Sequence, residues 1–311
     1  MVQILKKRFL TLNLSQECNK RMDYGISFIG GKFPMKETVE KANLSERLGF
    51  DYIWVGESPT FALPFELMAA IAENTEKITI GVGIISPLLY NDTHIIKAFQ
   101  TLKEVYGNRF IIGLGPGDLH HLESVGLEQK NFLKRIRECI KNLKEHKATK
   151  DMPIFVGAAG PKMIELASSE SDGVLLNYVH PSFIKWSLER FKKKVYTVAY
   201  GPSLVCPDTD NRKRLIMAAA TVAISIREEI QEIFGIKETV DEIKKIFDEG
   251  RLKDIWKHEV FIAEKFALCA AIDKLKEKII ELEEIGVDQI IFSYPASHDK
   301  SSIEKLSKTL F

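Results

Sequence analysis

The sequence has no apolar run that approaches the roughly 20 residues of a membrane-spanning helix, so we expect no membrane partner. Neither sign of charge prevails. The 44 basic and 43 acidic residues leave a net charge of +1, and no basic stripe carries interleaved aromatic residues, which argues against a nucleic-acid partner. The cysteines are few, scattered and without a C-x-x-C pair, which argues against zinc and indicates a reducing cytoplasm. They are Cys18, Cys139, Cys206 and Cys269.

Several catalytic signatures are absent as well. No HExxH, GxSxG or Walker pattern occurs. The adjacent pair His120 and His121 would diverge by about 100° on a helix, so it is a poor metal site. The glycine cluster at 113–117 resembles a dinucleotide fingerprint, but it follows the fourth strand-like run instead of the first and lacks the third glycine. An open doubly wound sheet is therefore the second choice for the fold.

What the chain does contain is a regular alternation of short strand-like runs and amphipathic helical segments. The strand-like runs cover residues 24–29, 52–56, 78–85, 110–114, 154–157, 173–177, 195–200 and 289–293. Helical spacing is clear at 38–48, 134–147 and 273–285, and Gly49 and Gly286 stand just past two of these segments, where helices end. Strands that alternate with helices predict a parallel sheet, and eight such units predict a closed (β/α)8 barrel.

Two regions depart from this alternation. Residues 1–21 are basic and precede the first strand-like run, and we interpret them as a loose extension of a single barrel domain at 22–311. Residues 207–265 are dominated by charged helical runs at 227–234, 237–247 and 253–266. We interpret the latter region as extra helices between the seventh and eighth strands, placed to cover the active site or to contact another subunit.

Function in such a barrel is expected on the loops that follow the strands. After the fifth strand, the run Gly157, Ala158, Ala159 and Gly160 leads into a helix that opens with Pro161. Small residues at a helix N-terminus expose backbone N–H groups that can hold a phosphate. A tight turn without a ligand is the plainer interpretation, and we favour the phosphate site.

Acidic residues follow two other strands. Glu57 ends the second strand, where a carboxylate is a candidate acid or base, although a surface glutamate is the common case. Asp118 follows the fourth strand, where capping of a short helix at 119–125 is the alternative. In the third strand, Gly81 and Gly83 suggest either close packing against a neighbouring helix or a backbone ridge against a flat ring.

Together these segments resemble the luciferase-like superfamily, and within it the coenzyme F420-dependent methylenetetrahydromethanopterin reductases. The resemblance covers nearly the whole chain after Met22, in order. It rests on Tyr24-Gly25-Ile26-x-Phe28, Leu48-Gly49-Phe50-Asp51-Tyr52-Ile53-Trp54, Ile80-Gly81-Val82-Gly83-Ile84-x-Ser86-Pro87, Gly107-Asn108-Arg109-Phe110, Gly113-Leu114-Gly115-Pro116-Gly117-Asp118, Gly157-Ala158-Ala159-Gly160-Pro161, Ser171-Asp172-Gly173-Val174-Leu175-Leu176-Asn177 and Ser293-Tyr294-Pro295.

The resemblance implies a (β/α)8 barrel that binds the deazaflavin F420 and transfers hydride to a one-carbon unit on a pterin. It implies a non-prolyl cis peptide at Gly83–Ile84 behind the deazaflavin ring, a cofactor phosphate on the turn at 157–160, and a further cofactor contact at Asn177. Glu57 and Asp118 match acidic positions near the deazaflavin. Homo-oligomers are common among such proteins, so a homo-oligomer is expected.

The chain departs from the reductases at the proton donor. Ser27 stands where the family has a glutamate, Ser58 replaces a histidine after the second strand, and the segment at 145–152 is shorter. We therefore expect Glu57 or Asp118 to take over the donor role beside Ser27. Two alternatives stay open: an FMN-dependent luciferase-like monooxygenase, and a paralogue that binds a cofactor without turnover.

Overall fold

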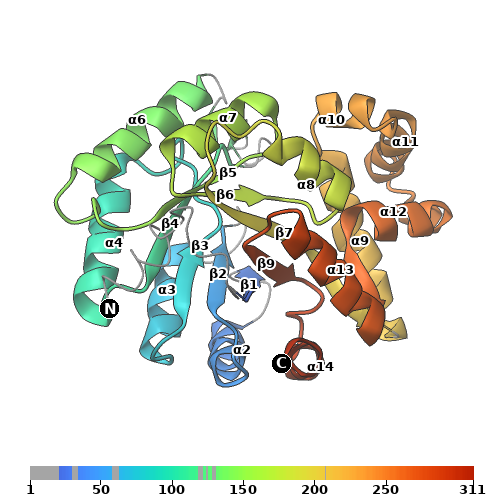
Figure 1. The fold of residues 1–311 in the computed structure, drawn as a ribbon, viewed down its shortest axis with the longest axis horizontal. Coiled ribbons are helices and arrows are strands. Elements are labelled where there is room, and N and C mark those ends of the chain that lie inside the picture. The colour runs from blue at the N-terminus through green and yellow to red at the C-terminus, as the bar shows by residue number, and fades with distance from the viewer. Residues whose placement is uncertain are drawn as a thin grey trace.

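The computed structural model describes residues 21–29, 34–57, 63–117, 122–123, 125–127, 131–206 and 208–311. Eight parallel strands form a closed barrel with helices outside it (Figure 1). These strands are β1 (Asp23–Ile29), β2 (Tyr52–Gly56), β3 (Thr79–Val82), β4 (Phe110–Leu114), β5 (Ile154–Gly157), β6 (Gly173–Leu176), β7 (Tyr196–Cys206) and β9 (Gln289–Ser293). Closure comes from the pairing of β6 with β7, β7 with β9, and β9 with β1. The predicted (β/α)8 barrel is confirmed, and the open sheet is excluded.

The helices that follow the strands cover the barrel from outside. They are α2 (Met35–Arg47), α3 (Pro64–Glu73), α4 (Asp92–Tyr106), α6 (Phe132–Glu145), α7 (Pro161–Glu170), α8 (Pro181–Leu188), α13 (Ile272–Glu284) and α14 (Lys300–Leu310). Gly49 and Gly286 have positive φ of 94° and 104°, so they end α2 and α13 as predicted. Within the described residues, no helix is long and apolar enough to span a membrane.

A separate apolar cluster fills the inside of the barrel. It consists of Tyr52, Trp54, Ile111, Phe155, Leu175, Tyr196, Val198 and Ile291. Glycines on neighbouring strands make room for its largest ring: a Cβ atom on Gly81 would lie 2.6 Å from the Trp54 ring, and one on Gly25 would lie 3.2 Å from it. Gly81 is therefore a packing glycine, and its neighbour is a core tryptophan inside the barrel, not an external helix.

Two strands end at residues other than those predicted from the sequence. The third strand was expected to reach residue 85, but β3 ends at Val82, immediately before the Gly83–Ile84 peptide. The seventh was expected to end at residue 200, but β7 continues through Gly201 and Pro202 to Cys206. A proline normally interrupts a strand because it has no N–H to donate. Here Pro202 is paired with Ser293 of β9, so the strand continues past it.

The region between β7 and β9 forms an insert at one side of the barrel (Figure 1). It comprises α9 (Thr209–Ser225), α10 (Glu228–Ile233), α11 (Lys237–Asp248), the 3-10 helix η1 (Leu252–His258), α12 (Glu259–Phe266) and β8 (Leu268–Ala271). The predicted helical character of 207–265 is confirmed. The sequence did not reveal α9, and the four residues of β8 are too few to show a strand period. β8 pairs with the outer end of β7, from Ser203 to Cys206.

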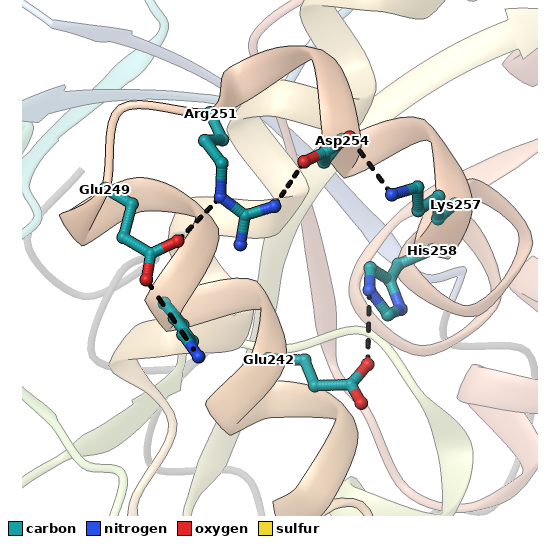
Figure 2. Close-up of polar contacts among 7 residues, drawn as sticks. Glu242, Glu249, Arg251, Asp254, Lys257 and His258 are labelled. Carbon is teal, nitrogen blue, oxygen red and sulfur yellow. Dashed lines mark hydrogen bonds and ion pairs between the residues drawn. The ribbon is translucent and has the colours of Figure 1, made fainter.

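The outer surface of the insert carries a chain of ion pairs (Figure 2). Arg251 lies between Glu249, at 2.6 Å, and Asp254, which also contacts Lys257 at 3.1 Å. His258 Nε2 lies 3.5 Å from Glu242. Most of these side chains are well exposed, and such pairs stabilise by only about 0–1 kcal/mol each. The network therefore accounts for the charged character of 237–258 as a solvated surface. No group of metal-ligating side chains occurs in the described parts of the chain.

Candidate functional site

A cavity of about 610 Å³ lies at the carboxyl ends of β1, β6, β7 and β9, where it is covered by α9. Because the barrel strands are parallel, their carboxyl ends share one side of the molecule. The strands contribute polar side chains: Ser27 from β1, Asn177 just after β6, Tyr200 from β7 and Ser293 from β9. Of the predicted site residues, Ser27 and Asn177 are thus brought together at one cavity.

Three hydroxyl groups meet on the strand side of this cavity. The Ser27 hydroxyl donates a hydrogen bond to the Tyr200 oxygen at 3.3 Å, although the two residues are 173 positions apart. Burial raises the pKa of Tyr200, and hydrogen bonds with Ser27 and Ser293 only partly offset this effect. Tyr200 is therefore a neutral hydrogen-bonding group at ordinary pH. It was missed in the sequence because only barrel closure places it beside Ser27.

The helix α9 contributes two cations to the opposite wall. Arg214 Nη1 donates to Asn211 Oδ1 at 2.9 Å, whereas the Lys213 ammonium has no partner among the described residues. No aspartate or glutamate is among the described residues that line the cavity. The cavity therefore favours a ligand that carries negative charge. Sequence reasoning missed both cations because it did not identify α9.

The Gly83–Ile84 peptide is cis, as the resemblance implied. Three glycines on the next strands accommodate this segment. A Cβ atom on Gly113 would lie 1.8 Å from the Val82 carbonyl oxygen, one on Gly115 would lie 2.8 Å from the Ile84 side chain, and one on Gly157 would lie 3.1 Å from it. The Ile84 side chain thus packs over the ends of β4 and β5 and closes the barrel interior from above. Side chains at these glycines would displace it.

The predicted phosphate turn leads from β5 into α7. The Ala158 N–H is occupied, because it donates to the Leu175 carbonyl at 3.0 Å. Within the described residues, the N–H groups of Ala159 and Gly160 donate to no acceptor. A Cβ atom on Gly160 would lie 3.6 Å from Cγ of Arg227 and 3.9 Å from a carboxylate oxygen of Glu229. The start of α10 therefore borders the turn, a proximity that the sequence did not indicate.

Glu57 lies apart from the cavity lining. Its carboxylate accepts a hydrogen bond from the Tyr90 hydroxyl at 3.3 Å. Burial and the charge of Glu57 raise the pKa of Tyr90, so the tyrosine stays protonated and able to donate. Asp118 and Ser58 lie outside the described residues, and so does most of the predicted short helix at 119–125. The choice of proton donor stays a prediction.

Comparison with known proteins places this barrel in a family. The luciferase-like monooxygenase family model matches residues 14–289. The chain belongs to this family. The 5,10-methylenetetrahydromethanopterin reductase of Archaeoglobus fulgidus is 27% identical over 328 residues, which cover 93% of this chain and 98% of that protein. The reductase of the same name from Methanolobus tindarius is 27% identical over 322 residues, covering 92% and 98%.

A solved structure agrees with the fold. The coenzyme F420-dependent tetrahydromethanopterin reductase of Methanopyrus kandleri superposes with a TM-score of 0.82 at 20% identity, covering 93% of this chain and 98% of that one. At this identity the likeness supports the barrel architecture. The resemblance to the reductases that the sequence motifs suggested is confirmed by relatives that match over 98% of their length.

Proposed function

We propose that this protein is an F420-dependent oxidoreductase that transfers hydride from reduced F420 to a one-carbon unit carried by a tetrahydromethanopterin-type pterin. The observation that carries the proposal is the match, over nearly their entire length, to two enzymes named 5,10-methylenetetrahydromethanopterin reductase. The cis Gly83–Ile84 peptide and the glycine-lined recess around it are the structural features that support it.

The residues that would hold F420 lie along the carboxyl ends of β3, β5 and β6. Gly83 and Ile84 would support the ring. The N–H groups of Ala159 and Gly160, which donate to no acceptor among the described residues, would bind the phosphate. Arg227 and Glu229 both lie beside that turn, so their charges offset each other there, and Asn177 offers an amide at the cavity. When bound, F420 supplies the hydride. The protein's main task is to orient the two reactants, because correct placement alone accounts for much of such a rate enhancement.

The polar cavity beneath α9 is the place that we assign to the pterin substrate. Lys213 and Arg214 would hold acidic groups of the substrate, while Ser27 and Tyr200 would hydrogen-bond to its polar edge. Together they would fix its position relative to the ring support at Gly83.

Opening of the methylene bridge needs a proton at the substrate nitrogen, and Ser27 is too weak an acid to supply it. We propose that Glu57 or Asp118 holds this proton. Replacement of each by its amide, Glu57→Gln and Asp118→Asn, should lower turnover at least tenfold in one of the two, without loss of F420 binding. Unchanged turnover in both variants would rule out this assignment.

The first test is equilibrium binding of the purified protein to oxidised F420 and to FMN, followed by fluorescence. Tight binding of F420 alone supports the proposal, and hydride transfer to methylenetetrahydromethanopterin is then assayed directly. A preference for FMN, with consumption of oxygen, would indicate a monooxygenase instead, because the same turn can hold the FMN phosphate. Binding of neither would indicate a paralogue without turnover.

We further propose a setting for this activity. Residues 22–311 would act as one domain, in a homo-oligomer within the cytoplasm, in the one-carbon chemistry of methanogenesis. The exposed helices of the insert are the surface that we assign to the subunit contact. Size-exclusion chromatography with light scattering would test the oligomer, and a single protomer mass would contradict it.

A further inference from the structure

Two cysteines stand at the two ends of the insert. Cys206 is the last residue of β7, immediately before the insert, and Cys269 is the second residue of β8, where the chain returns. In the register of these parallel strands, Cys269 is paired with Leu204, and Cys206 is paired with Ala271. Side chains of paired residues, and of residues two apart on a strand, point to the same face. Both thiols therefore lie on one face of this strand pair, in diagonal positions.

The two thiols lie near enough for each to shift the pKa of the other. Both residues are partly exposed, so a small reagent can reach them. Arg212 Nη1 lies 3.9 Å from the Cys269 sulfur, and Lys305 lies close by, with its ammonium on the Val205 carbonyl at 2.8 Å. A pair of adjacent thiols in a positively charged, accessible position is the arrangement typical of reactive cysteines.

The pKa values of the two thiols shift in opposite directions. The hydrogen bond from Cys269, aided by Arg212 and Lys305 and opposed by burial, lowers the pKa of Cys206 to about 7. The same contact and burial raise the pKa of Cys269. Cys206 is therefore the more readily ionised of the two thiols. Cys139 differs from both: it is fully buried, and burial together with Asp92 raises its pKa.

We propose that Cys206 and Cys269 form a reversible disulfide that closes the neck of the insert. The oxidant is a low-molecular-weight disulfide. The Cys206 thiolate attacks one of its sulfurs, the S–S bond of the oxidant breaks, and one small thiolate leaves. Cys269 then gives its proton to water and attacks the Cys206 sulfur, which expels the second small thiolate. Two protein thiols are oxidised, and one small disulfide is reduced to two thiols.

The disulfide would limit the movement of α9, the helix that covers the cavity. α9 begins at Thr209, three residues after Cys206, and it carries Lys213 and Arg214 into the cavity wall. A link from Cys206 to Cys269 encloses a loop of about 60 residues, which contains all four α-helices of the insert. The disulfide would therefore hold the base of α9 against β8 and restrict movement of the cover.

Peptide mapping of the intact protein tests the bond. The full-length protein is incubated without denaturant with oxidised glutathione, its free thiols are alkylated, and its peptides are analysed by mass spectrometry. The expected product is a cross-linked peptide pair containing Cys206 and Cys269, which dithiothreitol reverses. The variant Cys269→Ser should stop at a glutathione adduct on Cys206, and the control Cys139→Ser should cross-link like the parent. The proposal is overturned if both thiols stay alkylatable, or if a cross-link joins Cys18 or Cys139 instead.

Thermal unfolding tests the consequence for the insert. The oxidised protein should melt about 5 °C above the reduced protein, because the cross-link constrains the unfolded chain. The double variant with Cys206→Ser and Cys269→Ser should melt at the same temperature with and without glutathione. A cross-linked protein whose melting temperature does not rise would contradict the closure of the neck.

Discussion

The two ends of the barrel differ in whether their polar groups are hydrogen-bonded within the protein. At the amino ends of the strands, polar groups are buried and bonded to the protein itself: Arg109 donates to the carbonyls of Ala72, Thr75 and Ile78, and Asp23 accepts the hydroxyl of Tyr196 at 2.5 Å. At the carboxyl ends, the Lys213 ammonium and the N–H groups of Ala159 and Gly160 find no partner among the described residues.

This difference separates stability from function. A buried polar group without a partner costs about 1–3 kcal/mol, which explains why Arg109 and Asp23 are bonded within the protein. Gln289, at the amino end of β9, is an exception among the described residues: its Oε1 accepts from Trp54, but its Nε2 has no partner. The groups at the carboxyl end are accessible to solvent and to ligands. Leaving them without a protein partner therefore costs little folding free energy. Substitutions at the amino end should therefore lower stability, and those at the carboxyl end should lower binding or turnover.

The largest effect is expected at Arg109, which is 4% exposed. Arg109→Met would leave several buried carbonyl groups without a donor, so the free energy of unfolding should fall by about 3–5 kcal/mol in urea denaturation. Arg137 pairs with Glu170 at 2.7 Å on the surface, and Arg137→Met should cost less than about 1 kcal/mol. Equal losses in both variants would remove the distinction between the buried and the surface arginine.

The substitution Gly113→Ala lies at the carboxyl end, but it should lower stability as well as binding. Its Cβ would lie 1.8 Å from the Val82 carbonyl oxygen, so the backbone beside the cis peptide has to move. We expect a loss of about 3 kcal/mol in the free energy of unfolding together with weaker F420 binding, measured by urea denaturation and fluorescence titration. Gly160→Ala is the control for the unfolding measurement alone, since the nearest neighbour of its Cβ is the flexible side chain of Arg227 at 3.6 Å. A stable Gly113→Ala protein would show that the recess is not tightly packed.

Glu46 should make the stability of the amino end depend on pH. Its carboxylate accepts the N–H groups of Glu76, Lys77 and Ile78 at 3.0, 2.6 and 2.8 Å. Burial raises the pKa of Glu46, but these hydrogen bonds and Arg109 outweigh it and leave the pKa lowered. The folded-state pKa therefore lies below the unfolded value of about 4.3, and the stabilisation is present above that value and is lost as the pH falls through the folded pKa.

The variant Glu46→Gln tests this sign. It should lower the free energy of unfolding by about 1–2 kcal/mol at pH 7, and the difference from the parent should shrink towards pH 3. Urea denaturation at a series of pH values measures it. A deficit that is the same at every pH would show that the charge of Glu46 is not what stabilises the loop before β3.

The smallest effect on stability is expected at Lys213. Because its ammonium has no partner among the described residues, Lys213→Ala should change the free energy of unfolding by less than about 0.5 kcal/mol. If the cavity holds an anionic substrate, KM should rise about tenfold while kcat changes little, since a uniform binding contact is lost. Exposed Lys141 serves as the control for general charge effects. An unchanged KM would remove Lys213 from the binding site.

Much of the barrel was readable in the sequence. The strand-like runs and the glycines after the helices mark local conformations, and each of the eight predicted strands is present. The turn at 157–160 was readable for the same reason, because a run of small residues before Pro161 specifies a local geometry, and its role in phosphate binding stays a prediction. The cis peptide at Gly83 came from the resemblance alone, since local composition does not distinguish a cis bond from a trans one.

The sequence by itself thus determined the alternation of strands and helices, the family and the residues at the strand ends, because these depend on neighbours along the chain. Only the tertiary structure decided that Ser27 meets Tyr200, that Lys213 and Arg214 face the cavity, and that Cys206 lies beside Cys269. Each of these groupings joins segments far apart in the chain. Barrel closure brings β1, β7 and β9 together, and the insert leaves the barrel after β7 and returns beside it at β8. No local pattern encodes those contacts.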